Sequence, residues 1–194
     1  MRHQDLSLFK IPKGFRGKSK FFVQFWWIIH SLFFKFSPQI LYGWRRFLLR
    51  SFGAKIGKKV IIRPSVQITY PWKVTIGDYC QIGDEVVLYS LGEINIGNNV
   101  VISQRSYLCT GSHNYLKIDF PIYVEKITIK EQCWLGTDVY VAPGVTVGAG
   151  TVVGARSSVF KDLPPHKICV GSPVKIIKDR ISETSLSQVN HKRK

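Results

Sequence analysis

Apolar branched residues recur at every sixth position through the second half of the chain. From residue 129 the series runs without a gap through Ile129, Leu135, Val141, Val147, Val153 and Val159. The same period occurs upstream in three blocks of three, which are Ile56, Ile62 and Ile68, then Ile76, Ile82 and Leu88, then Ile96, Ile102 and Leu108. Neither the 3.6-residue period of a helix nor simple strand alternation produces a period of six. The pattern predicts stacked coils with flat faces, each carrying one short strand per face with its anchor residue pointing inward.

Glycine follows several of these anchors, as in the Ile-Gly pairs at 56–57, 76–77, 82–83 and 96–97. Because glycine tolerates positive φ at little cost, we expect it to turn the chain at the corners of the coil. Chance alternation in a β-sandwich is the competing interpretation, and fifteen anchors in one period speak strongly against it. The predicted fold class is therefore an all-β solenoid.

The repeat is interrupted between His113 and Ile127, where the pattern vanishes for the 13 residues 114–126. An insertion of that size leaving a rigid coil is typically a functional loop, although its aromatic residues could instead cap an edge. We expect a basic, aromatic helical region over 1–53 and a β-helix domain over 54–165 with inserted loop 114–126. A C-terminal segment with a basic tail should cover 166–194.

Two helices are expected in the N-terminal region. Ser37 followed by Pro38 is typical of a helix start, and Gly53 is a natural stop. The earlier segment, residues 21–36, is richly aromatic, and its apolar run is too short to span a bilayer. Aromatic residues beside a basic cluster suit a membrane interface, whereas packing on the first coils as a cap is the alternative.

The formal net charge of +16 is concentrated at the two ends of the chain. Residues 1–60 hold 13 Lys and Arg against one acid, residues 61–160 hold 7 against 8, and residues 161–194 hold 8 against 3. Basic ends predict contact with an anionic partner, which is membrane lipid, nucleic acid or a phosphorylated ligand. We favour a membrane surface over nucleic acid, and a solvated surface that merely aids solubility is the alternative.

The four cysteines form no Cys-x-x-Cys pair, which predicts free, mostly buried thiols in a reducing cytoplasm. No signal peptide is evident at the start of the chain. The expected location is therefore cytoplasmic, with peripheral contact to the inner face of the cell membrane.

The period, together with Val-Ala-Pro-Gly-Val-Thr-Val-Gly at 141–148 and Val-Gly-Ser-Pro-Val-Lys at 170–175, resembles the hexapeptide acyltransferases over roughly residues 54–180. The stretch Leu-Leu-Arg-Ser-Phe-Gly-Ala-Lys-Ile-Gly at 48–57 resembles acetyltransferases of colanic-acid-type exopolysaccharide clusters. This resemblance implies a left-handed parallel β-helix and a homotrimer with active sites between subunits. It also implies acetyl-CoA as the acyl donor for O-acetylation of a sugar hydroxyl in bacterial polysaccharide biosynthesis.

Acyl transfer to a hydroxyl needs a base, and histidine is suited to that role because it titrates near neutral pH. Of five histidines only His113 lies within the repeats, in Thr-Gly-Ser-His-Asn at 110–114, at the mouth of the inserted loop. The family's base lies in a Thr-Gly-His-like turn before such a loop, so the resemblance assigns His113 as catalytic. Ser112 is an extra residue in that turn.

The resemblance also implies the residues that hold the two substrates. Those that fall at coenzyme A positions are Trp134, Thr137, Ala155, Phe160, Lys161, Lys175 and Lys178. Lysines there make physical sense because an ammonium group pairs well with phosphate. On the acceptor side Tyr89 falls where related sugar acetyltransferases carry a hydroxyl-binding asparagine, and Glu93, Asn114 and Asp119 are further candidates. Glu93 or Asp119 could orient His113 or could be solvated surface acids.

Two other functions fit a coil of this kind. Metal-dependent carbonic anhydrases need several histidines converging on zinc, and one histidine in the repeats cannot build that site, so no metal is expected. A non-catalytic scaffold or docking protein is the remaining alternative. For an acetyltransferase the acceptor could be a sugar nucleotide, a lipid-linked oligosaccharide or a finished polymer, and the N-terminal helices favour the lipid-linked form.

Overall fold

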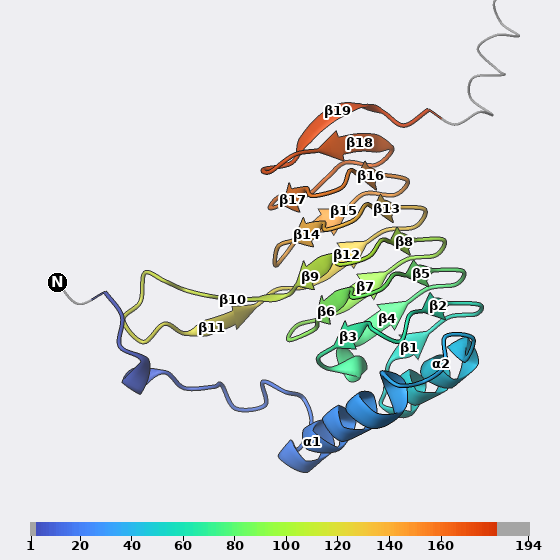
Figure 1. Ribbon diagram of the computed structural model, residues 1–194. Helices are drawn as coiled ribbons and strands as arrows, with labels where there is room; N and C mark the ends of the chain where they lie inside the picture. The colour runs from blue at the N-terminus through green and yellow to red at the C-terminus, as the bar shows by residue number, and fades with distance from the viewer. Residues whose placement is uncertain (1–2, 182–194) are drawn as a thin grey trace, which may run out of the picture.

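A computed structural model describes residues 3–181, in which a parallel β-helix rises from two helices at its base (Figure 1). The coils carry three sheets, one on each flat face. Sheet A contains β1 (Lys55–Ile56), β4 (Val74–Ile76), β7 (Ile94–Ile96), β12 (Ile127–Ile129) and β15 (Thr146–Val147). Sheet B contains β2 (Ile61–Ile62), β5 (Gln81–Ile82), β8 (Val101–Ile102), β13 (Trp134–Leu135), β16 (Val152–Val153), β18 (Lys167–Val170) and β19 (Lys175–Asp179). Sheet C contains β3 (Gln67–Ile68), β6 (Val87–Tyr89), β9 (Tyr107–Cys109), β14 (Tyr140–Val141) and β17 (Ser158–Val159).

The anchor residues stack in register into three columns, one behind each sheet. The column of sheet A is Ile56, Ile76, Ile96, Ile129 and Val147. The column of sheet B is Ile62, Ile82, Ile102, Leu135, Val153 and Cys169. The column of sheet C is Ile68, Leu88, Leu108, Val141 and Val159. All are buried in one continuous core, so the solenoid predicted from the six-residue period is confirmed.

The corner glycines serve close approach, and their predicted role in positive φ is wrong. A Cβ on Gly97 would lie 2.6 Å from the backbone nitrogen of Glu131 in the next coil, closer than real Cβ contacts. Positive φ falls instead two positions after each corner glycine, for example at Asn99 (56°) and Arg156 (58°). Glycine is therefore selected where stacked corners leave no room for a side chain.

The N-terminal region forms helix α1 (Lys20–Ile29), a π-helical turn (η2, His30–Phe34) and helix α2 (Tyr42–Ser51). The predicted start of the second helix at Ser37-Pro38 is wrong, because α2 begins four residues later. The Ser37 hydroxyl instead donates to the carbonyl of Phe34 (2.6 Å) and accepts from Arg45 Nη1 (2.8 Å), so it closes the turn between the helices. Within residues 3–181 no helix is long and apolar enough to cross a bilayer.

Side chains of these helices satisfy the open edge of the first coil. In the body, N–H groups of one coil donate to carbonyls of the next, as from Ile61 to Cys80 (2.8 Å). First-coil carbonyls have no coil beneath them, and an unpaired buried carbonyl is costly. Five side chains donate to this row: Trp26 Nε1 to Ile68 (2.9 Å), His30 Nε2 to Val66 (3.0 Å), Arg45 Nε to Ile62 (2.6 Å), Arg46 Nη1 to Val60 (2.8 Å) and Arg50 Nη2 to Ile56 (2.7 Å).

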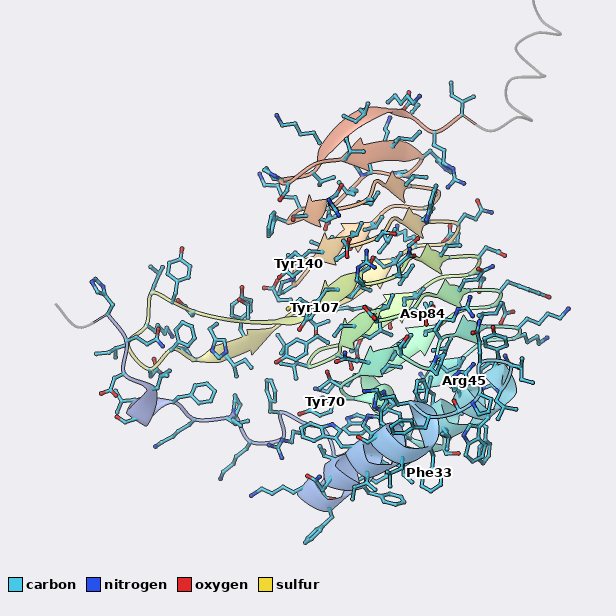
Figure 2. All side chains as sticks on the ribbon, in the orientation of Figure 1. Phe33, Arg45, Tyr70, Asp84, Tyr107 and Tyr140 are labelled. Atoms are coloured by element: carbon cyan, nitrogen blue, oxygen red, sulfur yellow. The ribbon has the colours of Figure 1, made fainter. Side chains whose placement is uncertain are left out.

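These hydrogen bonds to the first-coil carbonyls explain why a histidine and an arginine lie in the interior of the N-terminal region. Burial lowers the pKa of His30, which favours the neutral imidazole. Its Nε2–H donates a hydrogen bond to the Val66 carbonyl. Arg45 is fully buried between α2 and the first coil (Figure 2). The three arginines of α2 are therefore structural donors to backbone carbonyls.

Smaller elements complete the fold. One 3₁₀ turn (η1, Leu6–Leu8) lies near the chain start and another (η3, Pro71–Lys73) precedes β4. The segment before α1 runs alongside a projecting arm formed by β10 (Gly111–His113) and β11 (Ile122–Val124) (Figure 1). The predicted C-terminal segment begins with the β18–β19 hairpin, and the basic tail beyond residue 181 lies outside the described residues.

Candidate active site

His113 lies on the projecting arm, at the end of β10. The arm leaves the solenoid between β9 on sheet C and β12 on sheet A, where the six-residue repeat is interrupted. Its two strands pair antiparallel, with His113 opposite Ile122. The backbone of the histidine is therefore part of a β-ladder and not of an irregular loop. The insertion predicted to be a loop thus contributes β11, which pairs with β10 just before it to form a short hairpin.

A backbone carbonyl fixes the tautomer of His113. Its Nδ1 lies 2.9 Å from the carbonyl oxygen of Phe120. Because a carbonyl can only accept, Nδ1 carries the proton, and in the neutral imidazole Nε2 therefore holds the lone pair. Nε2 has no hydrogen-bond partner among residues 3–181. This is the arrangement that a general base requires.

Two aromatic rings hold the plane of the imidazole. The Phe120 ring stacks on it at 4.4 Å with an interplanar angle of 10°, and the Phe9 ring lies 5.7 Å away. The arm is also tied to the N-terminal segment, since the Asp5 N–H donates to the Ile118 carbonyl (2.7 Å). Sequence reasoning missed Phe9 and considered Phe120 only as a loop aromatic that could cap an edge, because neither follows the repeat that identified His113.

The acceptor-side candidates surround the arm without touching the imidazole nitrogens. Glu93, at the arm's base, pairs with Lys126 at 3.8 Å. The Asn114 side chain accepts from the N–H of Leu116 (3.0 Å), which turns the chain after His113. Asp119 lies half-buried at the far end of the arm, next to Phe120. The atom that orients His113 is the Phe120 carbonyl, so orientation by Glu93 or Asp119 is wrong.

An aromatic column that the sequence did not indicate runs along sheet C. Tyr89, Tyr107, Tyr140 and Phe160 follow one another with ring centroids 5.9, 6.2 and 5.8 Å apart. Figure 2 shows Tyr107 and Tyr140 on the side of the coils from which the arm projects. Burial raises the pKa of both Tyr107 and Tyr140 to about 12, so their hydroxyls stay protonated and can donate hydrogen bonds.

A groove of about 880 Å³ opens between sheet C and the N-terminal helices. Tyr89 and Tyr107 line one end, while Trp27, His30 and Lys35 line the other. Aromatic rings with polar groups between them are suited to sugar binding. His113 does not line this groove, but Tyr89 pairs in register with Cys109, four residues before His113 along the chain.

Several coenzyme A candidates share the outer face of sheet B. Trp134, Val152, Ile168 and Lys178 form one cross-strand row, because each is the register partner of the next. A register shift in β19 places Lys175, opposite Val170, on the same face as Lys178. The Trp134 indole is half exposed, and its Nε1 donates to the Ser103 hydroxyl (3.0 Å).

Thr137 and Ala155 occupy the corners that follow β13 and β16, where the N–H of Arg156 donates to the Thr137 carbonyl (2.8 Å). They therefore lie at the edge of the same face as Trp134. Phe160 and Lys161 are separated from this group. They follow β17 on sheet C, and the Phe160 ring contacts Tyr140. One chain thus divides the predicted donor site between two faces.

Thiol and metal chemistry find no support in residues 3–181. All four cysteines are unpaired, and Cys80, Cys133 and Cys169 are buried. Burial raises the pKa of Cys133 to about 11, which leaves it protonated and unreactive. No group of three or more His, Cys, Asp or Glu side chains in this part of the chain could hold a metal ion.

Comparison with known proteins connects this geometry to a family. Residues 126–161 match the family described as bacterial transferase hexapeptide (six repeats). The chain is 62% identical over 178 residues to an Escherichia coli protein named as a colanic acid biosynthesis acetyltransferase, WcaF, covering 92% of this chain and 98% of that one. It is 31% identical over 138 residues to the galactoside O-acetyltransferase of Escherichia coli, covering 70% and 68% of the two chains.

The solved structures agree. A Vibrio cholerae hexapeptide-repeat acetyltransferase in complex with acetyl coenzyme A superposes with a TM-score of 0.77 at 26% identity, covering 84% of this chain and 89% of that one. A Clostridium difficile maltose O-acetyltransferase shares the fold, with a TM-score of 0.77 at 24% identity. The repeat, the fold and an extensive sequence identity lead to one assignment: the chain belongs to the hexapeptide-repeat acetyltransferases.

Proposed function

We propose that the protein transfers the acetyl group of acetyl-CoA to a sugar hydroxyl in bacterial polysaccharide biosynthesis, with His113 as general base. The observation that carries the proposal is the Phe120 carbonyl on Nδ1, which leaves Nε2 ready to accept a proton. Nε2 takes the hydroxyl proton while the hydroxyl oxygen attacks the thioester carbonyl. The carbon–sulfur bond then breaks, and the imidazolium returns the proton to the sulfur of coenzyme A.

The donor is proposed to lie along sheet B. Trp134 offers an exposed ring to the pantetheine arm, Thr137 and Ala155 offer backbone groups at the corner, and Lys175 and Lys178 face the phosphates. Phe160 and Lys161 complete the site from sheet C. On the acceptor side we assign Tyr89, Glu93, Asn114 and Asp119, the residues around the arm.

The proposed assembly is a homotrimer with sites between subunits. His113 projects from the edge between sheets C and A, whereas the Trp134 row faces outward from sheet B. For a thioester bound on sheet B, we therefore expect the base to come from the arm of a neighbouring copy and not from the arm of the same chain. This separation supports a shared site, in which a lone chain is incomplete.

Incubation with acetyl-CoA tests the proposal directly. We expect release of the coenzyme A thiol that depends on an added acceptor, with nucleotide sugars and prenyl-diphosphate-linked oligosaccharides as the panel. NMR of the product should place the acetyl group in an ester, labile to mild base. An amide product, or thiol release by a stable monomer in sedimentation, would contradict the hydroxyl acceptor or the shared site respectively.

Removal of the two phosphate-facing charges should affect donor binding more than turnover. For Lys175→Gln combined with Lys178→Gln we expect the KM for acetyl-CoA to rise about tenfold, as for two solvent-exposed charge pairs, with kcat nearly unchanged. Steady-state kinetics at saturating acceptor measures both. Lys130→Gln, an exposed lysine after β12 on sheet A, is the matched control and should leave KM unchanged. An unaltered KM in the double variant would remove these lysines from the donor site.

A further inference from the structure

The two N-terminal helices carry separate inner and outer faces. On α1, Val23 and Trp26 are buried against the body. Their neighbours Phe21, Phe25, Ile28 and Leu32, at spacings of four, three and four residues, remain exposed on the opposite side. On the turn and α2, Ile40, Trp44 and Phe47 repeat this pattern while Arg45, Leu48 and Leu49 are buried. Capping the solenoid therefore uses only one side of each helix.

The outer residues form one apolar surface. We define the outer face as Phe21, Phe25, Ile28, Leu32, Phe33, Phe36, Ile40, Trp44 and Phe47. Phe21 is 90% exposed and Ile40 is 81% exposed, which is unusual for such side chains in an isolated soluble domain. Trp44 Nε1 donates to the Phe33 carbonyl (2.9 Å), so the two helices are joined within this surface. Figure 2 shows Phe33 on the side of the helices that points away from the coils.

The lysines around the outer face indicate which kind of partner covers it. Lys18, Lys20 and Lys35 are exposed beside it, and Lys10 and Lys13 lie exposed on the segment that leads into α1. Asp5 is the single acid in residues 1–60, against 13 Lys and Arg. Two copies packed through this face would bring like charges together, whereas an anionic lipid surface would pair with them. Aromatic side chains edged by lysine are typical of a helix lying in the membrane interface.

We propose that the outer face inserts into the interfacial layer of an anionic membrane, with α1 and α2 lying parallel to its plane. Because α1 and α2 lie at the base of the solenoid (Figure 1), its first coil is then the coil nearest the lipid. An acceptor carried on a lipid would enter the groove beside Trp27 and Lys35 from this side. The docking itself does not depend on the proposed acetyl transfer, so each can fail alone.

The test is co-sedimentation of the full chain with vesicles of phosphatidylcholine and 30% phosphatidylglycerol, and with pure phosphatidylcholine. We expect strong binding to the anionic vesicles at low salt. The binding should weaken without vanishing at high salt, because each lysine contributes about fivefold through a screened attraction. The triple variant Phe21→Gln, Ile28→Gln and Leu32→Gln should bind at least tenfold more weakly with an unchanged circular dichroism spectrum.

Matched controls separate insertion from adsorption. Tyr115→Gln with Leu116→Gln removes two large exposed side chains from the arm and should leave vesicle binding unchanged. Quenching of tryptophan fluorescence by brominated lipid in the unmodified chain, weakened in Trp44→Phe, reports insertion without relying on the triple variant. No binding to anionic vesicles at low salt would overturn the proposal. Binding abolished by high salt and unaffected by the triple variant would overturn insertion. Self-association beyond the proposed trimer that the triple variant removes would assign the face to a second copy and would also overturn it.

Discussion

Replacing His113 by alanine is expected to lower turnover by about 10²- to 10⁴-fold, the usual contribution of a general base. The variant loses the imidazole, whose Nε2 has no hydrogen-bond partner among residues 3–181 and is the proposed proton acceptor. The affinity for acetyl-CoA should change little, because the proposed donor residues lie on sheet B and not on the arm. Steady-state turnover together with calorimetric titration of coenzyme A measures both quantities.

A second histidine provides the control for that experiment. His166 is exposed in a corner near the C-terminal hairpin, with φ of 56°, a conformation that asparagine tolerates well. His166→Asn should therefore keep wild-type turnover. Partial recovery of His113→Ala activity by added imidazole would support a proton-transfer role over a structural one. Near wild-type turnover in His113→Ala would show that another group is the base.

The repeat made the solenoid predictable, because a strict period of six leaves few ways to bury every anchor. Ile56 and Ile76 are 20 residues apart, two more than three repeats of six, because the corner with η3 lies between them, yet they are register partners. The role of the corner glycines was not predictable from one coil alone. A single corner suggests a need for positive φ, whereas the contact between Gly97 and Glu131 exists only after two coils are stacked.

The environment of His113 depended on contacts that no local pattern carries. Its position at the break in the repeat was visible in the sequence. The Phe120 carbonyl reaches Nδ1 because the hairpin folds back, and Phe9 reaches the ring from a segment 104 residues earlier in the chain. The carboxylates suggested as orienting groups were plausible by residue type alone, and the antiparallel ladder placed a carbonyl there instead.

The basic residues of the N-terminal region fall into two groups, the hydrogen-bonded arginines of α2 and the exposed lysines beside α1. Arg45, Arg46 and Arg50 are hydrogen-bonded to backbone carbonyls of the first coil or its approach. The lysines that flank α1 remain exposed. A count of charges could not separate these groups, because the open edge that requires the arginines appears only when the first coil is formed. Cap and membrane contact are thus compatible, each on its own face of the helices.

The buried cap arginine predicts a large loss of stability. Arg45 donates to the carbonyls of Ile62 (2.6 Å), Pro38 (2.9 Å) and Gln39 (2.5 Å) as well as to the Ser37 hydroxyl. Arg45→Met is similar in length but leaves these acceptors without their donor. We expect the free energy of unfolding to fall by about 3–5 kcal/mol, since each unsatisfied buried group costs roughly 1–3 kcal/mol. The thermal midpoint should drop by roughly 10 °C at fixed protein concentration.

Two variants of α2 determine whether that loss comes from the unsatisfied carbonyls. Arg46→Met removes one donor from a half-buried site on the same helix and should cost only about 1 kcal/mol. Arg45→Lys keeps the charge but lacks the planar guanidinium that reaches four acceptors, so its midpoint should lie between those of wild type and Arg45→Met. Differential scanning calorimetry of the three variants gives the order directly. If Arg45→Met melts with the wild type, the first coil tolerates an open edge, and the basic residues of α2 are retained for a reason other than capping.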